Sequence, residues 1–170
     1  CKQWHLSNDR PNKYKEKFKR VIETLDTGVK VLLAIGEIDC RLNEGILKQV
    51  KKSPEKSQMA LIESTIQNYL NYVQKVAHSK SLHVIIQGVP CPNIDANNIE
   101  KNDLAMLIQF IKDFNDVLRH RSIQMEFEFL DVHQLTDRGD GLSNSVWHID
   151  QNHLSPAGMV EAWRSHLVRI

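Results

Sequence analysis

Two short apolar runs, Val29-Lys30-Val31-Leu32-Leu33-Ala34-Ile35 and His83-Val84-Ile85-Ile86-Gln87-Gly88, decide the fold of this chain. Both are nearly continuous and rich in β-branched and aliphatic residues, which is typical of strands that are buried on both faces of a sheet. A third run, Glu126-Phe127-Glu128-Phe129-Leu130-Asp131-Val132, alternates more clearly between apolar and polar residues. It is predicted to be an edge strand.

Helical patterns lie between the three runs. Residues 13–25, 57–77, 102–118 and 156–168 each place apolar side chains on one stripe, and Ser53-Pro54 is predicted to separate a short helix from the long second one. Alternating helices and strands indicate right-handed crossovers and a parallel sheet covered on both faces. The sequence therefore predicts an α/β protein, a flavodoxin-like three-layer α/β/α sandwich with a mainly parallel sheet.

The extent of the domain is a separate expectation. No linker, repeat or low-complexity tract divides residues 1–170, so we expect one domain. A complete sheet of this kind has about five strands, and only three are visible. The chain also opens on Cys1 rather than on methionine. We therefore expect the domain to be truncated at its N-terminus, with one or two strands upstream.

The composition excludes several classes of function. The 170 residues are 41% hydrophobic and 25% charged with a net charge of +1, as in an ordinary globular protein. Five basic residues near the N-terminus are interrupted by acidic ones and indicate a solvated helix face: Lys13, Lys15, Lys17, Lys19 and Arg20. No partner nucleic acid or membrane is expected, since no long basic block and no apolar run of about 18 residues occurs. Three cysteines without metal-ligand spacing favour reduced thiols and a cytoplasmic location.

The segment Asp150-Gln151-Asn152-His153-Leu154-Ser155-Pro156-Ala157-Gly158 carries the chemistry. A carboxylate three residues before a histidine can fold back and accept the Nδ1–H, which leaves Nε2 to take a proton from a nucleophile. Ser155-Pro156 is a typical helix start, with a capping hydroxyl and proline at the first helical position. A bare Asp-x-x-His is more often only a loop hydrogen bond. The residues that follow it and its place at the end of an α/β chain favour the functional interpretation.

This segment resembles the last conserved block of the SGNH/GDSL hydrolases. The resemblance implies a flavodoxin-like sheet, and hydrolysis or transfer of acyl groups, often acetyl on carbohydrate, by serine, histidine and aspartate without a cofactor. It implies that His153 is the general base and Asp150 the residue that orients it.

A second block, Gly36-Glu37-Ile38-Asp39-Cys40-Arg41, resembles the family pattern Gly-x-Asn-Asp at the end of a strand. Gly36 and Asp39 match, but Ile38 replaces the asparagine of the oxyanion hole and cannot donate a hydrogen bond. The variant is similar to a subgroup associated with bacterial glycans. Glu37 or Arg41 could supply the missing polar contact, and Arg41 could equally bind an anionic substrate group. Alternatively, Glu37, Asp39 and Arg41 form an ion-pair cluster that holds the loop.

The family's Gly-Asp-Ser block is not found. Ser7 lacks a preceding apolar strand, so the nucleophilic serine is predicted to lie upstream of the chain. Cys40 and Cys91 are expected to be ordinary thiols. Trp147 and His148 either form a lip that stacks on a sugar ring or anchor the loop by packing.

The histidines do not indicate a metal. His133, His148 and His153, taken with Asp131, have no spacing typical of metal ligands, so no metal site is expected.

The sequence thus predicts an SGNH-type ester hydrolase or O-acyltransferase acting on a small-molecule or glycan ester, with a carbohydrate ester favoured. The alternative is a non-catalytic SGNH-like module that binds a glycan or a protein. A nucleotide-binding domain is a weaker interpretation, since no glycine-rich phosphate loop follows a strand. The oligomeric state is left open.

Overall fold

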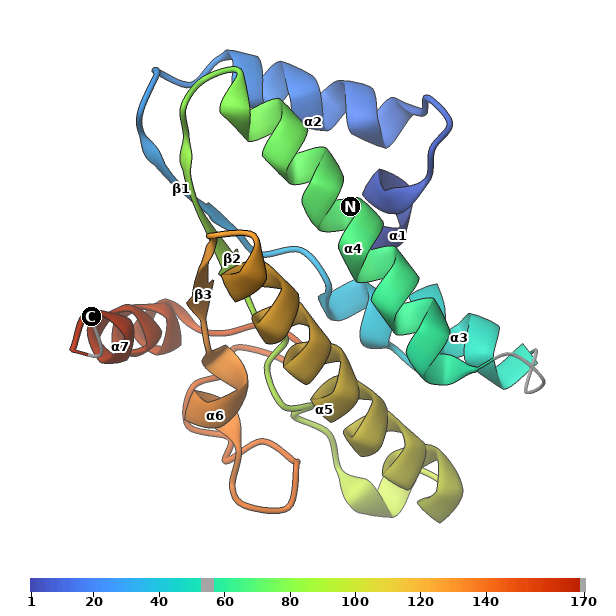
Figure 1. Cartoon of the computed structure of the whole chain (residues 1–170). Coiled ribbons are helices and arrows are strands. Elements are labelled where there is room, and N and C mark those ends of the chain that lie inside the picture. Colours follow the sequence, from blue (N-terminus) through green and yellow to red (C-terminus); the bar gives the residue numbers. More distant parts are fainter. Residues whose placement is uncertain (53–56, 169–170) are drawn as a thin grey trace.

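The computed structural model of the chain describes residues 1–52 and 57–168 (Figure 1). The elements in chain order are α1 (Gln3–Ser7), α2 (Lys13–Glu23), β1 (Lys30–Leu33), the 3-10 helix η1 (Glu37–Cys40), α3 (Gly45–Lys52), α4 (Gln58–His78), β2 (His83–Gln87), the 3-10 helix η2 (Ala96–Asn98), α5 (Lys101–Gln124), β3 (Glu128–Leu130), α6 (Val132–Thr136) and α7 (Pro156–Leu167). The predicted break at Ser53-Pro54 lies outside the described residues.

The predicted parallel sheet is confirmed. Its described strands have the order β1-β2-β3 and all pair in parallel, with Leu32 opposite Ile85 and Ile86 opposite Phe129. The third strand lies at an edge, as predicted, but is shorter than the predicted run 126–132. Glu126 has a positive φ of 61° in the preceding turn. At the other end, the Asp131 carboxylate accepts the Gln134 N–H at 3.0 Å and so starts α6 instead of extending the strand.

Helices cover both faces of the sheet, as expected for a three-layer sandwich. Alternation along β2 sends Val84 and Ile86 into the large core beneath α4 and α5, and Ile85 into a smaller core beneath α7. Figure 1 shows α7 on the opposite side of the strands from α4 and α5. Among the described residues, the small core has four buried members, Ile85, Leu130, Val132 and Ala162. The two faces of the sheet are therefore packed unequally.

The helix boundaries follow local capping. The Ser57 hydroxyl accepts the Ala60 N–H at 3.3 Å and begins α4 where the sequence predicted. The Ser155 hydroxyl accepts the Gly158 N–H at 3.1 Å, with Pro156 at the first helical position, and begins α7. Helix α5 runs on to Gln124, beyond the predicted end at residue 118. Capping was readable from the sequence, whereas the C-terminal extent of α5 was not.

Helix α1 is held against the end of β1 by one residue. The buried Gln3 side chain donates to the Ile35 carbonyl at 2.6 Å, and its backbone N–H donates to the Asp39 carboxylate at 2.6 Å. Gly36 between them has a φ of +146°, and a Cβ there would lie 3.0 Å from the Gln3 amide nitrogen. A glycine is therefore needed for this close approach.

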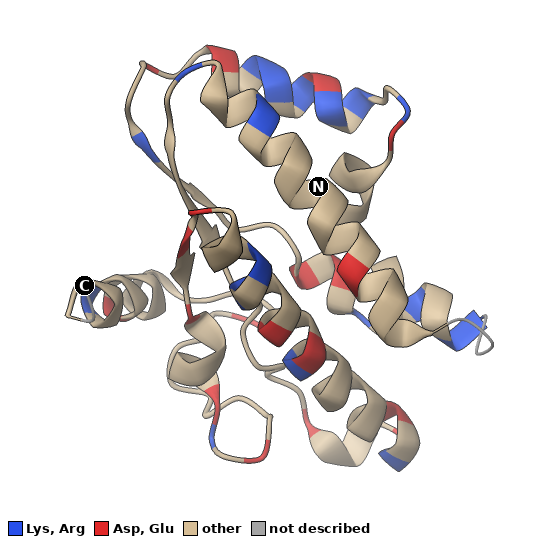
Figure 2. Ribbon diagram, in the orientation of Figure 1, with Lys and Arg blue, Asp and Glu red and all other residues tan. Residues whose placement is uncertain are grey.

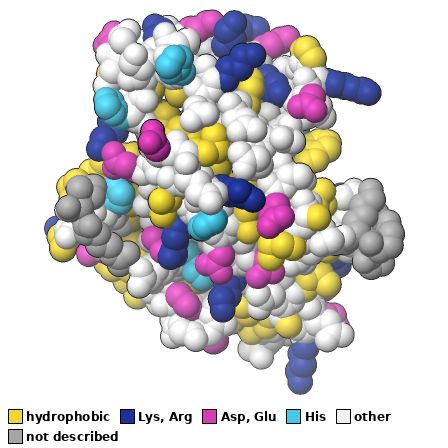
Figure 3. All heavy atoms as spheres, viewed as in Figure 1, with side chains coloured by type: hydrophobic (Ala, Val, Ile, Leu, Met, Phe, Trp, Pro, Cys, Tyr) yellow, Lys and Arg dark blue, Asp and Glu magenta, His cyan; other side chains and the backbone are white. Residues whose placement is uncertain are grey.

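The charged surface agrees with the predicted solvated helix face. Lys13, Lys17, Lys19 and Arg20 are exposed along α2 (Figure 2). Lys15, the fifth predicted residue, is half-buried, and its ammonium lies 4.6 Å from the centroid of the Tyr72 ring. On the face seen in Figure 3, acidic, basic and apolar side chains are interspersed. None of the helices in the described ranges is long and apolar enough to cross a membrane.

Burial of Asp39 makes stability depend on pH. Asp39 is 0% exposed, and burial raises the pKa of its carboxyl to about 6, against about 4 in an unfolded chain. The folded state thus binds this proton more tightly. The stabilisation is fully present below about pH 4 and is lost as the pH rises through 6, with a loss of about 3 kcal/mol.

Urea unfolding of the protein and of Asp39→Asn between pH 4 and 8 measures this loss. We expect the unfolding free energy of the unchanged protein to fall relative to that of the variant as the pH rises. Parallel pH profiles for the two proteins would contradict it.

Candidate active site

The Asp150–His153 loop is built around one carboxylate. Asp150 Oδ1 accepts the backbone N–H groups of Asn152 and His153, each at 2.7 Å, and Oδ2 lies 2.8 Å from His153 Nδ1. These hydrogen bonds, with those of the backbone first, lower the pKa of Asp150 to about 2. The carboxylate therefore stays ionised and fixes the imidazole, whose side chain is 58% exposed.

The ends of this loop are clamped to the start of α7. The Ile149 N–H donates to the His153 carbonyl at 2.9 Å, and the Ser155 N–H donates to the Trp147 carbonyl at 2.7 Å. Gly158 lies against the same backbone: a Cβ there would be 2.5 Å from the Trp147 carbonyl oxygen. This contact explains the glycine in the Leu-Ser-Pro-Ala-Gly segment, because α7 could not approach Trp147 with any side chain at that position.

His153 faces a cavity, here called the histidine hollow, of about 220 Å³ at the carboxyl ends of β1 and β2. Such ends are where sites form in parallel sheets. The hollow is lined by Leu32, Ala34, Ile35, Glu37, Gln87, Gly88, Pro90, Asn152, His153, Leu154 and Met159. None of these described lining residues carries a hydroxyl or a thiol.

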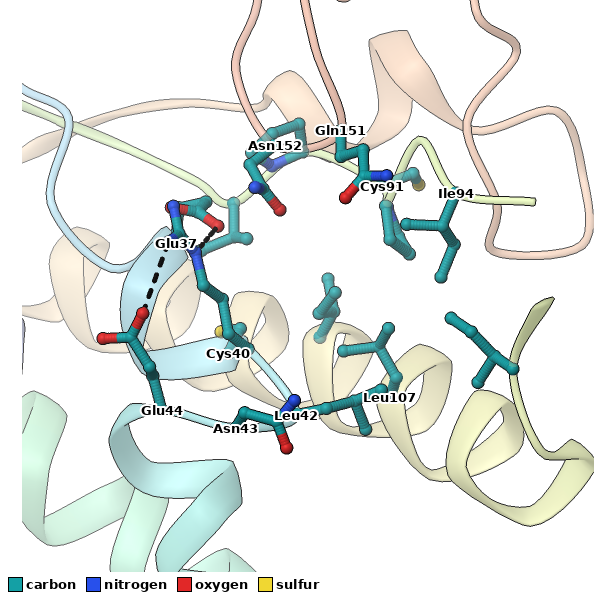
Figure 4. A pocket seen from close by; sticks show the side chains of 16 residues that line it. Glu37, Cys40, Leu42, Asn43, Glu44, Cys91, Ile94, Leu107, Gln151 and Asn152 are labelled. Carbon is teal, nitrogen blue, oxygen red and sulfur yellow. Dashed lines mark hydrogen bonds and ion pairs between the residues drawn. The ribbon is translucent and has the colours of Figure 1, made fainter. Parts of the chain in front are cut away.

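A second cavity, here called the η1–α5 pocket, has a volume of about 330 Å³ (Figure 4). It is lined by Glu37, Cys40, Arg41, Leu42, Asn43, Glu44, Val89, Pro90, Cys91, Pro92, Ile94, Ile99, Leu107, Ile111, Gln151 and Asn152. Three residues, Glu37, Pro90 and Asn152, line both cavities. The pocket is therefore adjacent to the hollow that holds the histidine.

The charged residues of the Glu37–Arg41 segment make two separate sets of contacts. Arg41 Nε and Nη2 bond to the two Glu37 carboxylate oxygens at 2.7 and 2.8 Å, and Nη1 lies 3.4 Å from Glu44. These contacts, with the Glu37 hydrogen bonds first, raise the pKa of Arg41. The Lys2 ammonium, 3.2 Å from Glu44, lowers the pKa of that carboxyl. The cluster expected from Glu37, Asp39 and Arg41 thus contains Glu44 instead of Asp39, which binds α1.

The loop after β2 forms the shared wall of the two cavities. The buried Asn115 amide binds the Val89 N–H at 2.7 Å and the Val89 carbonyl at 2.9 Å, and so ties this loop to α5. Cys91 in the same loop is 0% exposed, and burial raises the pKa of its thiol to about 12. Burial also raises the pKa of Cys40. Neither thiol is suited to be a nucleophile.

Other predicted residues lie apart from both cavities. Trp147 and His148 line neither cavity. Trp147 packs against Gly158. His148 forms an isolated antiparallel β-bridge with Leu154, and its Nδ1 lies 2.9 Å from Ser143 Oγ. Their contacts match the packing alternative better than the sugar lip. The Ser7 hydroxyl donates to the Trp4 carbonyl at 2.9 Å within α1.

The remaining histidines do not assemble a cluster. Within residues 1–52 and 57–168, no group of three or more His, Cys, Asp or Glu side chains is arranged to hold a metal ion.

Two residues of the site were missed by the sequence analysis. Asn152 lies between the acid and the base, lines both cavities, and uses only its backbone N–H in the hydrogen bonds of the described chain. Its place inside the Asp-x-x-His segment was a usable signal. Asn115 interrupts the apolar stripe of α5 between Ile111 and Leu118. A polar residue on a buried stripe is the signal that could have identified it.

The three-stranded parallel sheet flanked by helices is an α/β fold that solved structures share. Phospholipase A1 from Streptomyces albidoflavus NA297 has a similar crystal structure, with a TM-score of 0.52 and 14% identity over 91% of this chain and 74% of that chain. A Bacteroides fragilis NCTC 9343 protein, proposed to be an acylhydrolase, gives a TM-score of 0.48 and 10% identity over 94% of this chain and 97% of that chain. No family model matches the sequence, and no curated protein matches it.

Replacing Gly158 with alanine should displace the loop that holds His153. The new Cβ would force α7 away from the Trp147 carbonyl, and we expect a loss of about 1–3 kcal/mol in unfolding free energy together with altered NMR signals of the His153 ring. Ala157→Gly, at an exposed neighbouring position, is the matched control: it should lower stability by about 1 kcal/mol through helix propensity alone and leave the His153 signals in place. Unchanged His153 signals in Gly158→Ala would show that the contact does not position the loop.

Proposed function

We propose that the protein is an SGNH-type ester hydrolase or O-acyltransferase that uses a Ser-His-Asp mechanism. The observation that carries the proposal is the Asp150 Oδ2–His153 Nδ1 bond of 2.8 Å, with the ring at the mouth of a cavity at the carboxyl ends of β1 and β2. A carboxylate on Nδ1 leaves Nε2 as the base, which is the arrangement of serine hydrolases on unrelated folds.

The nucleophile in this proposal is a serine on a segment that precedes Cys1. Two features support it. The described strand β1 pairs with β2 on one side only, so a parallel strand can add to its outer edge. The carboxyl end of such a strand would arrive beside Ala34 and Ile35, which line the histidine hollow and where no described hydroxyl lies.

The reaction then proceeds in two halves. His153 Nε2 takes the proton of the serine hydroxyl while the serine oxygen attacks the ester carbonyl carbon. The tetrahedral intermediate collapses, its carbon–oxygen bond to the alcohol breaks, and the alcohol leaves with the proton from His153. Water, or the hydroxyl of an acceptor, repeats the sequence on the acyl-enzyme and regenerates the serine. Asp150 keeps the imidazole oriented throughout.

The oxyanion requires donors that Ile38 does not supply. In this proposal Asn152 takes that part, because its side-chain amide is available and lines the cavity of His153 as well as the η1–α5 pocket. Arg41 is less suited, since its guanidinium is bonded to Glu37 and Glu44. An uncharged amide held at the end of a rigid loop can stabilise developing negative charge without reorganising.

The substrate in this proposal is a small-molecule or glycan ester, with an acylated carbohydrate as the class that the sequence resemblance favours. The alternative, a non-catalytic binding module, is the outcome expected if no serine reaches His153. The two are distinguished by the gene sequence upstream of Cys1: an apolar strand followed by Gly-Asp-Ser supports the enzyme.

The activity itself is tested with 4-nitrophenyl acetate and the protein extended upstream of Cys1. His153→Ala should lower kcat by about 10⁴-fold, and Asp150→Asn by a similar factor, because the base is lost or no longer oriented. His120→Ala, at an exposed position of α5, is the control and should leave the rate unchanged. Equal rates for His153→Ala and the unchanged protein would remove His153 from the mechanism.

The part assigned to Asn152 gives a separate prediction. Asn152→Ala should lower kcat by about 10²-fold with little change in KM, since the amide is expected to bind the transition state more tightly than the ester. Asn71→Ala, which removes an exposed asparagine amide from α4, is the matched control. A rise in KM with an unchanged kcat would assign Asn152 to substrate binding instead.

A further inference from the structure

The η1–α5 pocket has two walls of different chemistry. One wall is apolar and is formed by Val89, Pro90, Ile94, Leu107 and Ile111. The other wall is polar: Glu37 and Glu44 lie across the pocket from Ile94 (Figure 4), and Arg41 is bonded to both carboxylates. Gln151 and Asn152 lie next to each other along the edge of the pocket (Figure 4), and Asn152 also lines the histidine hollow. A ligand must therefore be apolar along its length and polar at the end that meets the histidine hollow.

The charges on the polar wall leave no site for an anion. Arg41 directs Nε and Nη2 to Glu37 at 2.7 and 2.8 Å, and its third nitrogen, Nη1, lies 3.4 Å from Glu44. The described residues that line the pocket include no other lysine, arginine or histidine. The Glu44 carboxylate is also paired with the Lys2 ammonium at 3.2 Å. An anionic group would therefore meet two carboxylates and an arginine whose fork is already occupied.

We propose that the η1–α5 pocket binds the uncharged acyl chain of the ester, and that Glu37 is a specificity-determining residue because it occupies Arg41. This inference rests on the proposed function for the identity of the chain as an acyl group. The chain would lie against the apolar wall, with its carbonyl at Asn152 beside the histidine hollow. Acyl groups that end in a carboxylate are excluded, although the pocket contains an arginine.

The experiment measures binding and needs no turnover. 1-Octanol and octanoate, which is ionised at pH 7, are titrated separately into the protein, and the backbone NMR signals of Leu107, Ile111 and Asn152 are followed. We expect octanol to shift these signals and octanoate to bind at least tenfold more weakly. Shortening the alcohol by one methylene should weaken binding by about fourfold. Equal binding of octanol and octanoate, or signals that move elsewhere in the protein, would overturn the assignment.

The Glu37→Gln variant tests the specificity. It removes the charge that occupies Arg41, so octanoate binding should strengthen at least tenfold while octanol binding is unchanged. Asp140→Asn is the matched control, because Asp140 holds Arg138 by two bonds of 2.9 Å in a loop that lines neither cavity. This control should leave both affinities unchanged. An octanol-to-octanoate ratio that Glu37→Gln does not alter would remove Glu37 as the specificity residue.

A second variant covers the case in which Glu37→Gln disturbs the loop. Arg41→Met keeps the length of the side chain and removes the cation, so octanoate should bind still more weakly while octanol is retained. Stronger octanoate binding in Arg41→Met would contradict the proposal. Binding that depends on chain length, without esterase activity in the extended protein, would contradict the proposed function and support the apolar pocket as a binding site. Esterase activity without such binding would support the proposed function and contradict the pocket assignment.

Discussion

The candidate site depends on the carboxylate of Asp150, which satisfies three donors within its own loop. Two of them are the backbone N–H groups of Asn152 and His153, and the third is the imidazole. The backbone donors keep the carboxylate ionised and in place whatever the protonation state of the ring. The same bonds fix the backbone from which the Asn152 side chain projects. One carboxylate thus orients the histidine ring and fixes the backbone of Asn152.

The η1 turn shows how two carboxylates close in sequence can have different tasks. Asp39 points inward, is fully buried, and receives the first N–H of α1. Glu37 points into the pocket and holds Arg41. The tight 3-10 turn separates the two carboxylates in space although only Ile38 lies between them. The inner side of this block therefore serves folding, because it attaches α1 to the sheet, and the outer side shapes the cavity.

Much of the fold could be predicted because it is encoded locally. The runs 29–35 and 83–88 are apolar at successive positions since both faces of each strand are covered, and Ser155-Pro156 caps α7 through its own neighbours. The Asp150–His153 bond followed from a spacing of three. Residues 37, 39 and 41 gave no such indication of which carboxylate meets Arg41, because Gln3 takes Asp39 across 36 positions of sequence. The structural roles of Asn115 and Gly158 likewise depend on residues elsewhere in the chain, Val89 and Trp147 respectively.

The unequal packing of the two sheet faces explains why the Asp150–His153 loop is held by hydrogen bonds within itself. The η1–α5 pocket lies against α5 and the large core, so its apolar wall packs against buried residues. The histidine lies on the other side, where α7 covers a core of four buried residues and exposes Val160 and Leu167. Such a thinly packed layer opens locally at a lower free energy than the main core. A histidine positioned only by tertiary packing there would be poorly fixed. Holding it by hydrogen bonds over three residues makes its orientation independent of that weaker layer.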